Sequence, residues 1–196
     1  ASDVYKRQVW DDAQDSWAIA HDEIGKVLQG IDFHSFFAPF VGEITEDLIV
    51  MPNVSYPTDI EVGVRHDGKL FCLIPPRIAW GDNEPWPFDE DHAHIIRGAV
   101  SQYARLLMET YLRQNAVYIA PATSTPLPVN DDFRALHPTW GDQFTALFVA
   151  ASVAIFLEQT FGKPEAEAYM LMENKVNGLK LLPSVVNVLQ RYQEEY

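Results

Sequence analysis

The chain has 196 residues, and 28 acidic against 14 basic side chains give it a formal net charge of −14 at pH 7. This charge argues against binding to nucleic-acid backbones and to anionic membranes, because both attract cationic protein surfaces. The single cysteine excludes an internal disulfide and a multi-cysteine zinc site, and it is consistent with a reducing, cytoplasmic location.

The first eight residues, ASDVYKRQ, resemble the translated sequencing-adapter readthrough found at the ends of gene fragments assembled from environmental (metagenomic) DNA. We therefore expect a non-native leader at 1–8 and a single domain over 9–196. Hydrophobic residues make up 47% of the chain and aromatic residues 12%, which is typical of a folded, soluble globule. An apolar stripe and an acidic first turn over 11–29 predict the first helix.

Four phenylalanines between residues 33 and 40 form an aromatic cluster, which we expect to lie in the core. Residues 47–51 are apolar and predict a short strand that ends at Pro52. With the hairpin that follows along the chain they make three strands, the smallest number that forms an independently stable sheet.

A β-hairpin is predicted between residues 60 and 74. Apolar residues alternate with other types in its first half, and Asp67-Gly68 is a strong two-residue turn signal. The resulting register places Gly63 opposite Cys72. The apolar side chains that share the other face are Val62, Val64, Phe71 and Leu73. Because Gly63 has no side chain to cover the sulfur, we expect a local opening beside the thiol.

Cys72 has two interpretations. A lone free cysteine is usually a small buried hydrophobe. A nucleophilic cysteine needs a nearby base or helix N-terminus that lowers its pKa. His66 lies at the turn, about 10 Å away at ~3.3 Å per strand residue, which is too far for a hydrogen bond. His92 or His94, on the helix that follows the hairpin, could reach the sulfur.

The order of motifs between Tyr56 and Arg113 resembles that of a known family. Tyr56-Pro57, a short β segment and Gly68-Lys69 precede Cys72, and tryptophans, a proline and an amphipathic helix follow it. This order is similar to that of the ubiquitin-conjugating (E2-like) family, in particular its divergent bacterial members. The resemblance implies that Cys72 accepts the C-terminus of a ubiquitin-like protein as a thioester and passes it to an amine, without a cofactor.

The loop over 78–88 contains two tryptophans among prolines and acidic residues. Trp80 and Trp86 could close a pocket or hold a peptide of a partner. They could equally cap an edge of the sheet, which is the interpretation we favour.

The residues that follow this loop predict the start of a long helix. Asp89 is a plausible N-cap, and Glu90 and Asp91 suit the positive N-terminal end of the helix dipole. His92 and His94 could bind a metal with these acids, but side chains two positions apart on a helix point in different directions. We therefore expect no metal site.

The second half of the chain predicts helices only. An amphipathic helix reaches about residue 113, the proline-rich stretch 121–128 connects it onward, and residues 143–160 form the most apolar helix. The sheet-containing part thus extends to about residue 120, and the helical part begins at about 138. The sequence predicts an α+β fold, in which a small antiparallel sheet of about three strands packs against a helical bundle of four to five helices.

Three functions remain open. The first is E2-like transfer of a ubiquitin-like protein through Cys72. The second is a noncatalytic acidic domain for protein interaction or assembly, in which the Trp80/Trp86 loop and the acids at 89–91 contact a basic surface of a partner. The third is a small-molecule enzyme with a pocket between the sheet and the helices, for which no residue pattern is specific.

Overall fold

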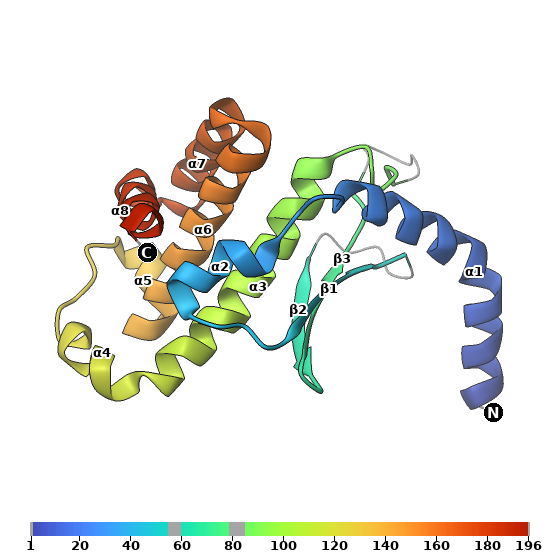
Figure 1. Ribbon diagram of the computed structural model, residues 1–196, viewed down its shortest axis with the longest axis horizontal. Helices are drawn as coiled ribbons and strands as arrows, with labels where there is room; N and C mark the ends of the chain where they lie inside the picture. Colours follow the sequence, from blue (N-terminus) through green and yellow to red (C-terminus); the bar gives the residue numbers. More distant parts are fainter. Residues whose placement is uncertain (1, 55–59, 79–84, 196) are drawn as a thin grey trace.

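A computed structural model describes residues 2–54, 60–78 and 85–195 of the chain, with side chains from residue 13 onward. The α+β class is confirmed, and the described residues form more helices than the four to five predicted (Figure 1). The elements are α1 (Ser2–Val27), α2 (Phe33–Val41), β1 (Asp47–Pro52), β2 (Val62–His66), β3 (Lys69–Ile74), α3 (His92–Gln114), α4 (Ala116–Thr123), α5 (Asp131–Leu136), α6 (Trp140–Phe161), α7 (Lys163–Asn177) and α8 (Leu182–Glu195).

The β2–β3 hairpin has the predicted register, with Gly63 opposite Cys72. Asp67 and Gly68 have φ values of 48° and 69°, the positive values that a type I′ turn requires at both central positions. This turn aligns the two strands antiparallel and fixes which side chains share a face.

The expectation of a purely antiparallel sheet is wrong, because β1 runs parallel to β3 and the strand order is β1-β3-β2. The outer edge of β2 is occupied, since Gln102 of α3 accepts a hydrogen bond from the Gly63 N–H and Arg105 of α3 donates one to the Gly63 carbonyl. β1 therefore pairs with the free edge of β3, and the chain crosses from one edge of the sheet to the other between β1 and β2.

α3 lies across one face of the sheet, and α6 packs on the other side of α3 with α7 and α8 beside it (Figure 1). α6 is longer than the predicted 143–160, because Thr139 and Asp142 form a capping box that begins the helix at Trp140. Among the described residues it is the one helix whose length and composition would allow it to cross a membrane, but most of it is buried within the fold.

The predicted aromatic cluster is part of the core. All four phenylalanines of α2 are buried. The ring centroid of Phe36 lies 4.7 Å from that of Phe156, and Phe40 lies 5.4 Å from Phe148. These edge-to-face contacts attach α2 to α6 and close the core beside α3.

Candidate functional site

Cys72 is fully buried on the face of the sheet that α3 covers. Its Sγ donates a weak hydrogen bond to the Gly98 carbonyl of α3, at 3.6 Å. Burial, and next the negative charge of Glu61, raise the pKa of the Cys72 thiol well above its ordinary value. The expectation of an exposed thiol is therefore wrong, and the sulfur is a neutral, buried group.

The space beside Gly63 is real, but α3 fills it. A Cβ atom at position 63 would lie 2.9 Å from Oε1 of Gln102 and 3.1 Å from Nη2 of Arg105. The glycine therefore allows α3 to approach the backbone of β2, and it gives solvent no path to Cys72.

The structure places none of the three candidate histidines in hydrogen-bonding contact with Cys72. His66 is exposed at the hairpin turn, next to Asp67. His92 is exposed at the first position of α3, and Nε2 of His94 bonds to the Pro75 carbonyl at 3.0 Å. Thiol transfer would need an accessible sulfur and a base beside it, and the described residues provide neither.

Trp86 packs against a side chain of its own chain. Trp80 lies outside the described residues. Trp86 is 38% exposed, and the guanidinium of Arg77 lies over its ring, 4.8 Å from the centroid. Arg77 also forms an ion pair with Asp91.

Asp91, and not Asp89 as predicted, is the N-cap of α3, because its side chain accepts a hydrogen bond from the backbone N–H of His94 at 3.0 Å.

Asp89 holds α1 against the start of α3. Its carboxylate pairs with Nζ of Lys26 at 2.9 Å, and this hydrogen bond lowers the pKa of Asp89. One residue earlier, the backbone N–H of Phe88 donates to Oε2 of Glu23, also at 2.9 Å. Of the three acids expected to contact a partner, two are thus paired within the chain, and Glu90 is the exposed one.

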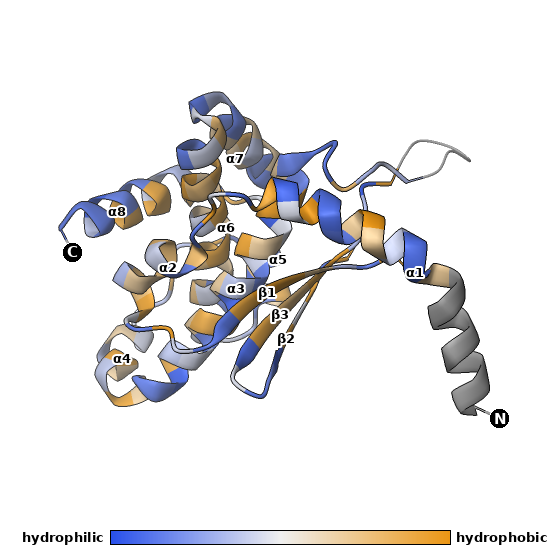
Figure 2. Ribbon diagram, turned by 45° about the vertical axis from the view of Figure 1, so that its right-hand side comes forward, coloured by the Kyte–Doolittle hydropathy of each residue, from blue (hydrophilic) through white to orange (hydrophobic). Residues whose placement is uncertain are grey.

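β1 and β3 consist mostly of apolar residues (Figure 2), and most side chains on the face of the sheet that points away from α3 are apolar. The register aligns its side chains in three cross-strand rows. Two rows are entirely apolar and the third, at one end of the face, is polar: Ile49–Phe71–Val64, Met51–Leu73–Val62 and Asp47–Lys69–His66. We call this surface the outer face.

The outer face is only partly covered. Val62 and Val64 of β2 are 46% and 43% exposed, and the central residues Phe71 and Leu73 are half-buried. α1 packs beside β1 through its C-terminal half, where Ile24 is buried. In the part of the chain that the structure describes, no element buries the two valines.

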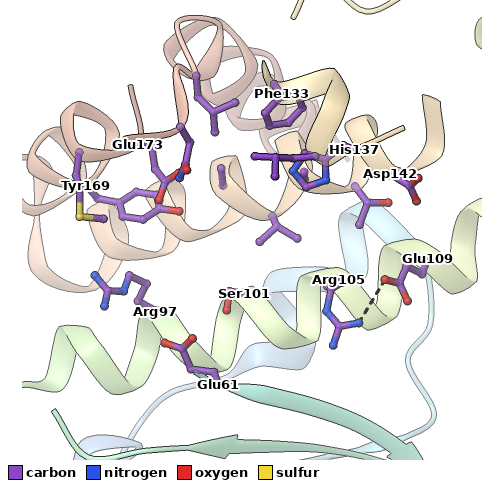
Figure 3. A pocket seen from close by; sticks show the side chains of 18 of the residues that line it. Glu61, Arg97, Ser101, Arg105, Glu109, Phe133, His137, Asp142, Tyr169 and Glu173 are labelled. Carbon is purple, nitrogen blue, oxygen red and sulfur yellow. Dashed lines mark hydrogen bonds and ion pairs between the residues drawn. The ribbon is translucent and has the colours of Figure 1, made fainter. Parts of the chain in front are cut away.

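A second open surface is a groove of about 840 Å³ between α3 and the helices α5, α6 and α7 (Figure 3). α3 contributes Arg97, Ser101, Arg105 and Glu109, whose four-residue spacing places them on one side of the helix. The sequence showed a polar stripe here, but such a stripe is typical of a solvated helix face. Sequence reasoning therefore missed the groove.

The remaining walls of the groove combine apolar and charged groups. Small and branched residues of α6, among them Ala146 and Val149, form its floor. Tyr169 and Glu173 of α7 face α3 across the groove, and Glu61 lies at its border toward the sheet (Figure 3). Burial and the adjacent Glu173 carboxylate raise the pKa of Tyr169, so its hydroxyl stays protonated at neutral pH.

The two open surfaces, the outer face and the groove, are thus the features from which a function can be inferred. A scan against protein-family models and searches of curated proteins and of solved structures found no match to this chain.

Proposed function

We propose that the protein is a noncatalytic interaction domain, which binds a protein partner on the outer face of its sheet. The observation that carries this proposal is the pair of wholly apolar rows across β1, β3 and β2. An antiparallel pair with one solvated face usually alternates apolar with polar residues, so that the solvated face is polar. Here the composition of the outer face is that of a buried one.

Covering the outer face is favourable because it removes apolar surface from water. Each Å² of apolar surface buried contributes roughly 25 cal/mol, and the exposed fractions of Val62 and Val64 leave such surface available. Exposed apolar residues that are contiguous, rather than scattered, are typical of binding sites.

The dimensions of the face fit one helix of a partner. Three neighbouring strands span roughly 10 Å between the outer two, at about 4.8 Å per strand pair. An α-helix with its side chains is about 10–12 Å wide. A single amphipathic helix laid on the sheet would therefore cover both apolar rows.

The charge of the chain favours a basic partner. With a net charge of −14, two copies of this protein repel each other, whereas a helix with lysine or arginine along its borders is attracted. We therefore assign the outer face to an amphipathic helix with an apolar side and basic flanks.

E2-like transfer through Cys72 would require α3 to separate from the sheet. α3 covers the sulfur, and the thiol donates a hydrogen bond to the Gly98 carbonyl of this helix. An interaction domain requires no such opening. Binding on the outer face is therefore the function that the geometry supports best.

A displayed library of amphipathic helices, half with basic and half with acidic flanks, tests the proposal. We expect the selected binders to have basic flanks and to lose at least tenfold in affinity when Val64→Lys places a charge in the apolar rows. Val117→Lys is the matched control, because Val117 is 84% exposed on α4, away from the sheet.

Binders that tolerate Val64→Lys, or that carry acidic flanks, would contradict the proposal. Sedimentation of the chain alone adds a second readout. A dimer that Val64→Lys dissociates would assign the outer face to a second copy of the chain instead of a basic partner.

A further inference from the structure

We propose that the groove between α3 and α7 is a separate binding site for an organic monocation with an apolar stem, which is an alkylammonium or alkylguanidinium group. The groove lies on the side of α3 away from the outer face, so this site does not depend on the proposed partner. We infer the chemical class of the ligand from the charged side chains of the groove that have no ion-pair partner and from the apolar floor.

Three of the charged groups in the groove are already satisfied. Nη1 of Arg105 pairs with Oε1 of Glu109 at 3.3 Å, which cancels one charge of each sign (Figure 3). Asp142 accepts a hydrogen bond from the Thr139 N–H at 3.1 Å, and it lies in the first turn of α6, where the helix dipole stabilises a carboxylate.

Glu61, Arg97 and Glu173 remain at the end of the groove next to α7, and they sum to one negative charge. Among the described residues none of the three takes part in an ion pair. The Glu173 carboxylate accepts a hydrogen bond from Nδ2 of Asn177 at 2.7 Å and also interacts with the Tyr169 hydroxyl. Nη2 of Arg97 lies 3.5 Å from Nδ1 of His94. A single added cation would therefore neutralise this end of the groove.

The groove also offers an apolar surface beside these charges. Ala146 and Val149 of α6 form the floor, and Met172 lies next to Tyr169 on α7. The Tyr169 ring gives a cation a favourable aromatic face, and its neutral hydroxyl can accept a hydrogen bond. The stem of the ligand would lie on the floor, and its charged head near Glu173 and Tyr169.

The size of the groove admits both a free amine and the side chain of a peptide. A volume of about 840 Å³ is in the range of small-molecule sites. The α3 wall extends over the 13 residues from Arg97 to Glu109, or roughly 18 Å at 1.5 Å of rise per residue, which is long enough for a side chain and its stem. A lysine or arginine side chain has the same head and stem as a free alkyl cation.

Calorimetric titration of the full chain with n-hexylammonium, n-butylammonium, n-hexylguanidinium and hexanoate tests this site. We expect the cations to bind, hexylammonium to bind tighter than butylammonium, and hexanoate not to bind. Glu173→Gln should weaken hexylammonium binding at least fivefold. Arg97→Gln should strengthen it severalfold, because it removes a like charge from the site.

Glu90→Gln is the control for net charge, since Glu90 is exposed outside the groove and its loss should leave binding unchanged. A short lysine peptide with blocked termini, compared with hexylammonium, shows whether the groove prefers a side chain or a free amine. Thermal unfolding of each variant confirms that it is folded.

Hexanoate binding that Arg97→Gln abolishes would overturn the proposal in favour of an anion site. Cation binding that survives Glu173→Gln, or the absence of binding by every cation at millimolar concentration, would also overturn it. Val64→Lys should have no effect on these titrations, so failure of the groove and failure of the outer face are distinguishable.

Discussion

The two faces of the small sheet differ in what covers them. On the inner face, Leu70, Cys72 and Ile74 of β3 are completely buried beneath α3, whereas on the outer face Phe71 and Leu73 of the same strand are only partly buried. Both sets are apolar, so β3 has the composition of a strand covered on both sides. Among the described residues, only the inner face thus has a complete covering layer.

The alternation in β2 suggests that its valines face the core, but in the structure its apolar side is the exposed one. Its valines point outward, and its polar side, with Gly63 and Arg65, points toward α3. The charge of Arg65 is tolerated there because Nε pairs with Glu46 at 2.9 Å and Nη2 donates to the Leu106 carbonyl at 3.3 Å, while Nη1 bonds to Thr110. Gly63 and Arg65 of β2 thus form hydrogen bonds with polar groups of α3 across the interface.

The largest expected effect comes from truncating one leucine on each face of β3. Leu70→Ala should lower the free energy of unfolding by about 2–5 kcal/mol, because Leu70 is completely buried and the change leaves a cavity. Leu73→Ala should cost on the order of 1 kcal/mol, since its side chain is only partly buried. Guanidinium denaturation of both variants measures the two losses of unfolding free energy. Equal losses would contradict the difference in burial between the two faces of the sheet.

A methyl group at Gly63 tests the contact between β2 and α3. Gly63→Ala should cost about 1–3 kcal/mol, because the added Cβ would overlap Gln102, whose Oε1 would lie 2.9 Å away. Gly25→Ala in α1 is the matched control: nothing lies within 4 Å of its added Cβ, and the change should be neutral or stabilising. If urea denaturation shows that Gly63→Ala leaves the free energy of unfolding unchanged, α3 does not pack closely against β2.

The smallest expected effect is a loss of stability at alkaline pH through Cys72. Its pKa is raised in the folded state, so the thiol stays neutral there, while the unfolded chain releases the proton above about pH 8.5. The stabilising contribution is complete below that pH and is lost as pH rises, by at most about 1.4 kcal/mol per pH unit.

Comparing the wild type with Cys72→Ala between pH 8 and 10 isolates this contribution. The variant should have the shallower decline of unfolding free energy with pH. Parallel declines would mean that the thiol is accessible in the folded state, and they would remove the distinction between the inner and outer faces.

The sequence was sufficient for features that depend on neighbouring residues. Asp67-Gly68 determined the hairpin turn, and the turn determined that Gly63 lies opposite Cys72. The four residues that the hairpin contributes to the outer face followed from the same alternation. These predictions succeeded because a type I′ turn leaves little freedom in the register of its strands.

Features that depend on distant residues could not be predicted in the same way. Which face of the sheet is buried depends on Gln102 and Arg105, about 40 positions from Gly63, whose polar side chains make the polar side of β2 the inner one. The groove depends on α7 approaching the polar side of α3. Asp91 caps α3 in place of the predicted Asp89, which instead pairs with Lys26, 63 positions away in the sequence.

The position of the only thiol, between β3 and the Gly98 turn of α3, gives the chain a built-in reporter of local motion. A disulfide reagent can react with it only when the helix and the strand separate. The rate of that exchange therefore measures how often this interface opens, without an engineered label and without a competing sulfhydryl elsewhere in the sequence. Ligands that bind on either side of α3 would register as a slower exchange.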